Sequence, residues 1–182
     1  MPKALRGSLI RVPDLPKTQP LGFVLAPDAE ACTEMARTLG LSALRKVRLE
    51  GTLAPAGRTD WQLDAHLGAT VEQPCVVTLA PVTTRIEEPV SRLYLADPPP
   101  APEGEVEMPE DDRVEALPET IDLGAVLLEA LALALPAYPR AEGVGFEDTQ
   151  VAEPGVTPMS DDAAKPFAGL AGLRDSLRKD ED

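Results

Sequence analysis

The sequence contains few of the residues that build metal sites, disulfide frameworks or membrane spans. Its 182 residues include two cysteines and one histidine, and aromatic residues make up 3% of the chain. Two thiols and one imidazole fall short of the four ligands of a structural zinc site. The N-terminus has no apolar targeting core, and no apolar run reaches the roughly 20 residues of a membrane helix. We therefore expect a reducing, cytoplasmic location, no membrane partner and no metal or other cofactor.

Motifs of common catalytic sites are also missing. The chain contains no phosphate-binding glycine loop, no nucleophile elbow and no zinc-protease helix. Its one histidine, His66, lies on the polar side of a predicted strand, and no nucleophile is identifiable for it to activate. We therefore expect a solvated His66 and a protein that is not an enzyme and has no small-molecule substrate.

Charge is distributed unevenly along the chain. The net charge is −14, but residues 1–96 hold 11 Lys and Arg against 10 Asp and Glu, whereas residues 97–182 hold 6 against 21. A protein with this acidic excess is repelled by nucleic-acid phosphates at long range. Direct binding to RNA would therefore need a local basic face, and a basic protein is the alternative partner.

Hydrophobic residues make up 43% of the chain, enough for an aliphatic core of Leu, Val and Ala. The length fits one α+β domain, which we place at residues 1–140. A flexible tail is expected over 141–182. Within this tail, residues 166–178 carry apolar side chains on one stripe, which indicates a short amphipathic helix.

Several segments have the pattern of β-strands, and the two central ones alternate apolar and polar residues with the period of a half-buried strand. The predicted strands are Ser8–Val12, Leu21–Ala26, Leu44–Leu53, Trp61–Val71 and Thr84–Leu95. A hairpin loop is expected at 54–59, and Trp61 is expected to point into the core. Pro89 indicates an edge position or a bulge, because proline cannot donate to a ladder.

Two helices are predicted. Residues 28–39 have Asp28 in a position suited to capping the first free N–H groups. Residues 123–135 are apolar on nearly every side, which is typical of a buried helix, and their cap is Asp122 or Thr120. The expected fold is α+β: a twisted antiparallel sheet, with closure into a barrel as a variant, covered by these two helices.

An acidic, proline-rich loop is expected over residues 97–118. Residues 97–112 alone carry seven acidic side chains, five prolines and no basic residue. Like-charge repulsion and missing N–H donors favour an extended chain here. Three roles remain open for this segment: an inert solubilising loop, a mimic of RNA that chaperones a basic protein, or a shield for the protein's own basic face.

Four segments, taken in order, resemble one protein family. They are Val71-Glu-Gln-Pro-Cys-Val-Val-Thr-Leu-Ala-Pro-Val82, Ile121-Asp-Leu-Gly124, Leu131-Ala-Leu-Ala-Leu-Pro-Ala-Tyr-Pro-Arg140 and Pro166-Phe-Ala-Gly-Leu-Ala-Gly-Leu-Arg174. Their order and spacing are similar to those of the bacterial YceD-like large ribosomal RNA subunit accumulation proteins. The resemblance implies a non-catalytic role in large-subunit (23S) rRNA accumulation and ribosome biogenesis. The implied partner is large-subunit rRNA or a pre-ribosomal particle, or else a basic ribosomal protein.

The family motif falls on Gln73, Cys75, Thr78 and Pro81. Many family members carry a second cysteine at this corner, where the present chain has Thr78. The chain therefore lacks the thiol pair on which a metal or redox role would depend. Two interpretations of Cys75 remain, a buried corner residue, which we favour, and a functional thiol.

Basic residues on two predicted strands could form a patch that contacts rRNA phosphates without reading sequence. The candidates for RNA contact are Arg45, Lys46, Arg48, Arg85 and Arg92. The alternative is an ordinary solvated face. The pattern favours this alternative, because Glu50, Glu87 and Glu88 are interleaved with the basic residues.

Overall fold

The computed structural model of this chain describes residues 8–98, 113–144 and 155. The chain divides into two units, residues 1–142 and 143–182, and the fold below is that of the first unit. The predicted helix at 166–178 and most of the acidic segment lie outside the described residues. The domain boundary at residue 140 stays a prediction.

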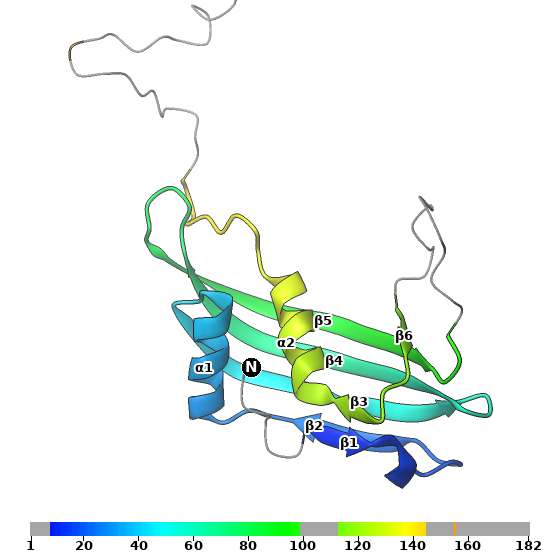
Figure 1. Ribbon diagram of the computed structural model, residues 1–182. Helices are drawn as coiled ribbons and strands as arrows, with labels where there is room; N and C mark the ends of the chain where they lie inside the picture. Colours follow the sequence, from blue (N-terminus) through cyan, green and yellow to red (C-terminus); the bar gives the residue numbers. More distant parts are fainter. Residues whose placement is uncertain (1–7, 99–112, 145–154, 156–182) are drawn as a thin grey trace, which may run out of the picture. The chain divides into compact units, whose positions relative to one another are not determined.

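Five strands form one sheet in the order β2-β3-β4-β5-β6 (Figure 1). Their bounds are Leu21–Leu25 for β2, Ala43–Ala56 for β3, Asp60–Pro74 for β4, Pro81–Leu95 for β5 and Val114–Ala116 for β6. Neighbouring strands are antiparallel, except β5 and β6, which run parallel. The outermost strands β2 and β6 do not pair with each other, so the sheet is open and the barrel variant is wrong.

A second, two-stranded sheet ties the start of the described chain to the second helix. Strand β1, Leu9–Arg11, pairs antiparallel with β7, Thr120–Asp122, and the 3₁₀ helix Val12–Asp14 follows β1. The Leu123 N–H donates to the Ser8 carbonyl at 2.9 Å. This pairing holds the beginning of the helix in place.

The prediction of an uninterrupted loop over 97–118 is wrong at its C-terminal end. Strand β6 lies inside this range, because the Leu93 N–H donates to the Arg113 carbonyl and the Leu117 N–H donates to the Leu95 carbonyl, each at 2.8 Å. A three-residue strand is too short to show a period of its own.

The long strands β3 and β4 confirm the alternating pattern and extend it. Leu49, Leu53 and Leu63 are fully buried, and Trp61 is 6% exposed. The pairing continues to Ala56 opposite Asp60, so the turn is shorter than the predicted loop. The long hairpin therefore presents one apolar face to the helices and one polar face to solvent.

Helix α1, Ala29–Leu39, is confirmed together with its cap. The Asp28 carboxylate accepts a hydrogen bond from the Ala31 N–H at 2.9 Å, and Gly40 ends the helix with a left-handed φ of 67°. Met35 lies on the buried side of the helix, which packs against β3.

Helix α2, Leu123–Ala134, crosses the same face of the sheet (Figure 1). Asp122 is its cap, and its carboxylate accepts from the N–H groups of Gly124 and Ala125 at 2.8 and 3.3 Å. Leu127 is fully buried, but Leu133 is 77% exposed. Leu131, in the last turn, is also fully buried, so the expectation of a buried helix holds for one side of α2 and not for the side that carries Leu133. Within 8–98 and 113–144, no helix is long and apolar enough to cross a membrane.

Candidate functional site

The motif residues predicted from sequence gather at the corner between β4 and β5. Gln73 lies near the end of β4, Cys75 and Thr78 lie in the connection, and Pro81 begins β5. The corner faces the segment 136–141, which leaves helix α2. We call these two facing segments, 73–76 and 136–141, the junction.

Hydrogen bonds close the junction at three points. They run from Gln73 Nε2 to the Pro136 carbonyl at 3.3 Å, from the Val76 N–H to the Pro139 carbonyl at 2.9 Å, and from the Ala141 N–H to Cys75 Sγ at 3.4 Å. Two of the four motif residues therefore use their side chains to hold the chain that follows α2. The motif acts here as a connection between the sheet and the helix exit.

Cys75 is fully buried at the centre of the junction. The Thr78 hydroxyl, followed by the backbone N–H groups of Thr78, Ala141 and Val77, lowers the pKa of the Cys75 thiol to about 6, although burial opposes this shift. The sulfur is therefore mainly a thiolate at neutral pH and accepts hydrogen bonds from its surroundings. This arrangement agrees with the expectation of a packed corner residue.

Gln73 contributes a second polar atom to this region. Its Nε2 is bonded to the helix exit, but its Oε1 is buried and has no hydrogen-bond partner among the described residues. A buried acceptor without a donor costs free energy. The side chain is therefore held by one bond on one side of its amide.

Four of the five candidate RNA contacts lie together on the outer face, the side of the five-stranded sheet turned away from α1 and α2. Strand β3 carries a bulge where the register shifts between Arg45 and Arg48, and Lys46 adopts a left-handed φ of 52° there. Arg45 pairs with Thr70 of β4, which in turn pairs with Arg85 of β5. The bulge thus brings basic side chains from two strands together.

A shallow depression of about 520 Å³ opens at this bulge. Its polar lining comes from Lys46, Arg48, Thr70 and Arg85. The Arg85 guanidinium reaches the Lys46 carbonyl and the Thr70 hydroxyl, each at 3.4 Å. This is the place on the described sheet with the chemistry to receive a phosphate.

The fifth candidate, Arg92, does not lie with the other four. Arg85 and Arg92 are seven positions apart on one strand, and an odd separation places side chains on opposite faces. Arg92 is 15% exposed and lies on the helix side, where Nε is 2.8 Å from Glu115 Oε1 and Nη2 is 3.0 Å from Glu129 Oε1. It joins β5 to β6 and α2.

Glutamates balance the arginines of the outer face. The three ion pairs are Arg45 with Glu72 at 3.2 Å, Arg48 with Glu50 at 2.8 Å and Arg85 with Glu87. Lys46 has no ion pair among the described residues. The face therefore carries charge of both signs, as the interpretation of a solvated face expects.

The remaining metal-binding and nucleophilic side chains are separated. His66 is on the outer face, 54% exposed, with Nδ1 3.5 Å from Glu87 Oε2. Cys32 lies on the buried side of α1, and burial, together with the negative charge of Asp28, raises the pKa of its thiol. Among the described residues, no three His, Cys, Asp or Glu side chains come together as a metal site would require.

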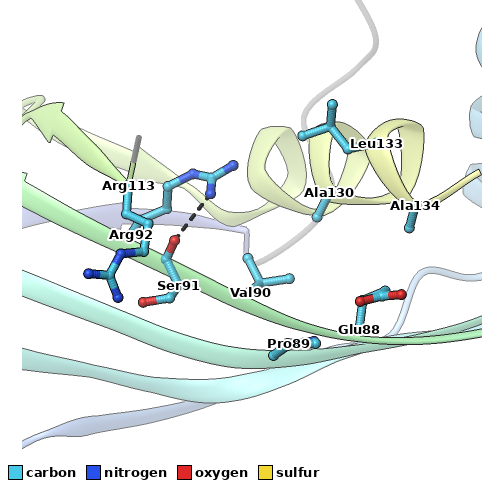
Figure 2. A pocket seen from close by; sticks show the side chains of 9 residues that line it. All are labelled: Glu88, Pro89, Val90, Ser91, Arg92, Arg113, Ala130, Leu133 and Ala134. Atoms are coloured by element: carbon cyan, nitrogen blue, oxygen red, sulfur yellow. Dashed lines mark hydrogen bonds between the residues drawn. The ribbon is translucent and has the colours of Figure 1, made fainter. Parts of the chain in front are cut away.

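A second depression, which the sequence did not predict, lies between β5 and the end of α2 and measures about 430 Å³. Figure 2 shows Ala130 and Ala134 turned from α2 towards the strand, and Leu133 turned away from it. Val90 and Glu88 of β5 line the opposite side. The sequence held one signal for this depression: the last turn of α2 carries more apolar side chains than the core covers.

A comparison with protein-family models identifies one match. The model described as "Large ribosomal RNA subunit accumulation protein YceD" matches residues 63–174, which is more than half of the chain. The matched range begins within β4 and includes β5, α2 and both sides of the junction. No curated protein and no solved structure matches the chain.

Proposed function

Because the chain belongs to the YceD family of large ribosomal RNA subunit accumulation proteins, we propose that it supports accumulation of large-subunit (23S) rRNA during ribosome biogenesis without catalysing a reaction. The observation that carries this proposal is the family match over 63–174. The matched range contains most of β4, strands β5 and β6, the second helix and the junction.

Direct contact with rRNA would use the bulge on the outer face. Lys46, Arg48 and Arg85 are exposed and line one depression, and Arg45 is exposed beside Lys46. Side chains of this kind bind phosphate and position RNA without reading its bases. Since the arginines already have glutamate partners, we expect weak, salt-sensitive binding in which Lys46 contributes most.

A basic ribosomal protein is the second candidate partner. Its support comes from charge: residues 97–182 hold 21 acidic side chains against 6 basic ones, and the outer face has no excess of positive charge. An acidic adaptor would bind the ribosomal protein in place of RNA and would affect rRNA indirectly. The acidic segment 97–112 is the natural contact for such a partner.

The experiment that tests the proposal is affinity purification of the tagged, full-length protein from its own cells, with and without RNase. Precursor large-subunit rRNA, recovered with ribosomal proteins that disappear after RNase, is the result expected for direct engagement of an assembling particle. One basic ribosomal protein that survives RNase identifies the adaptor. Recovery of neither class contradicts the proposal.

A variant lacking 97–112 separates the two candidates further. The adaptor interpretation expects the ribosomal protein to be lost from the purification. The direct interpretation expects rRNA recovery to persist, or to increase if the acidic segment shields the basic bulge. Undiminished recovery of the ribosomal protein would exclude the segment as its binding site.

A further inference from the structure

Strand β5 has a long open edge. It is paired with β4 from residue 81 to residue 94, whereas β6 covers its other side only at Leu93–Leu95. No other described strand pairs with the edge over residues 81–92. Among the described residues, the N–H and C=O groups along this edge are open to a strand from another chain, except the Ser91 carbonyl, which accepts from Arg92 Nη1 at 3.1 Å.

The residues that face this edge can be identified by parity. The Leu93 N–H donates to the carbonyl of Arg113, the residue before β6, so residue 93 faces the edge. The register with β4 runs from 81 to 94 without a shift. Every second residue of an antiparallel strand points its backbone groups the same way. The edge-facing residues are therefore Pro81, Thr83, Arg85, Glu87, Pro89 and Ser91.

The two prolines fall on edge-facing positions. Pro81 and Pro89 therefore lack an N–H on the open side, and the pairing with β4 is unaffected. This confirms the prediction that Pro89 occupies an edge, and the continuous register excludes a bulge at that point. The prolines also restrict how a second strand can pair here, because a proline opposite a proline leaves both positions without a donor.

We propose that this edge pairs with the same edge of a second copy of the chain, antiparallel, about a two-fold axis at Ile86. This register places Arg85 opposite Glu87 of the second copy at both symmetric positions. Cross-strand pairs of opposite charge stabilise a sheet. Residue 86 is also the midpoint of the edge-facing series, so the pairing spans the open edge and ends before β6. Four of its six edge-facing pairs include Pro81 or Pro89 and lack one N–H donor, so the Arg85–Glu87 pairs at the centre carry most of its stability.

The neighbouring registers are less favourable. An axis at Arg85 places two arginines opposite each other and sets Pro81 against Pro89 of the second copy. An axis at Glu87 places two glutamates opposite each other. Like charges directly opposite destabilise a strand pair. The pattern of charges and prolines therefore selects one register.

The depression beside the edge fits the same arrangement. With the axis at Ile86, Val82 of the second copy lies opposite Val90, and Thr84 of the second copy lies opposite Glu88. Val90 and Glu88 line the 430 Å³ depression under the end of α2 (Figure 2). An apolar side chain would thus enter beside the apolar wall, and a hydroxyl would meet the carboxylate. This complementarity is independent of the charges on the outer face.

Sedimentation equilibrium of the full-length protein over a range of concentrations tests the proposal. Wild type is expected to show a reversible dimer. Arg85→Glu and Glu87→Arg each place like charges opposite each other, and each should weaken dimerisation by about tenfold or more. An equimolar mixture of the two variants should dimerise again, because each chain then meets the opposite charge at both positions.

Two further variants keep the test specific. Arg48→Glu alters the same type of arginine–glutamate pair on β3, away from the edge, and should leave the dimer intact. Glu87→Pro removes an edge-facing N–H without changing the pairing with β4. This variant should be a monomer by sedimentation equilibrium and folded by circular dichroism.

Three outcomes would overturn the proposal. They are a wild type that stays monomeric at every concentration, single charge reversals that dimerise like wild type, and a mixture that does not recover the dimer. A monomeric wild type that loses another protein after Glu87→Pro would assign the edge to that partner instead of a second copy.

Discussion

The two faces of the sheet use the same residue types in different ways. On the helix side, Arg92 bonds to glutamates from two other elements and is 15% exposed. On the outer face, Arg48 and Arg85 each bond to the glutamate two residues further along the same strand, and both are about half exposed. Arg92 on the helix side therefore joins separate elements of the fold, whereas the ion pairs of Arg48 and Arg85 stay within one strand and are open to a partner.

The largest expected effect distinguishes two glycines on opposite faces. A Cβ at Gly51 would lie 2.2 Å from the Asp64 carbonyl oxygen and 2.5 Å from Ala65 Cα, so the backbone of β4 would have to move. A Cβ at Gly68 would instead meet the far end of the Arg85 side chain at 2.7 Å, which can turn away. We expect Gly51→Ala to lower the free energy of unfolding by about 3 kcal/mol, and Gly68→Ala by less than about 1 kcal/mol.

Urea denaturation of both glycine variants beside wild type measures this difference. Gly22→Ala is the control on β2, since nothing lies within 4 Å of the added carbon. Equal losses at Gly51 and Gly68 would show that the two sides of the sheet tolerate crowding alike.

The next prediction concerns the junction and pH. The folded pKa of Cys75, about 6, lies below the pKa near 8.5 of an unfolded cysteine, so the unfolded state binds more protons between these values. Stability from the thiolate is therefore fully present above pH 8.5 and is lost as pH falls through 6. The free energy of unfolding should rise between pH 6 and 8.5 in wild type, and less steeply in Cys75→Ala.

Denaturation curves at intervals across this pH range provide the measurement. Cys32→Ala is the matched control, because burial, together with the charge of Asp28, raises the pKa of that thiol. Its removal should not flatten the slope and should make it slightly steeper near pH 8.5, where the unfolded Cys32 thiol ionises. The same slope in Cys75→Ala as in wild type would assign the pH dependence to other groups.

A smaller effect separates the arginines of the two faces. Arg92→Ala leaves Glu115 and Glu129 without their shared partner and should cost about 1–3 kcal/mol of stability. Arg48→Ala removes an exposed pair and should change stability by about 0.5 kcal/mol or less. Thermal melts at equal concentration compare the two, and an equal shift would contradict the difference between the faces.

The smallest effect on stability is expected at Lys46, where a substitution should change RNA binding without changing the fold. Lys46→Glu should leave the melting temperature nearly unchanged, because no described residue pairs with this side chain. If the bulge contacts rRNA, recovery of precursor rRNA should fall in the affinity purification. Lys17→Glu alters an exposed lysine elsewhere and serves as the charge-matched control.

Local patterns predicted most of the elements. Helix α1 followed from its spacing of apolar residues and from Asp28, and β3 and β4 followed from strict alternation. Strand β6 was missed because three residues carry no period, and its existence depends on hydrogen bonds to β5. The odd separation of Arg92 from Arg85 already indicated that Arg92 lies on the other face of the sheet from the basic patch. Grouping the basic residues by charge alone obscured this signal.

The candidate site was likewise predicted only in part from the sequence. The sequence identified Gln73, Cys75, Thr78 and Pro81 through their resemblance to a family motif, but it could not show what they contact. The partners of Gln73 and Cys75 lie in 136–141, more than 60 residues away along the chain. Contacts at such separation depend on how α2 crosses the sheet, and local pattern contains no information on that crossing.

By itself, the sequence determined the α+β class, the two helices with their caps, the long hairpin and the family, because each depends on nearby residues or on their order. Tertiary structure alone decided that the sheet stays open, that Arg92 bonds to Glu115 and Glu129, and that Thr78, together with the helix exit, lowers the pKa of the Cys75 thiol. It also left one edge of β5 unpaired. These features arise from pairing and packing between distant segments, and the free energy of these contacts depends on several stretches of the chain together.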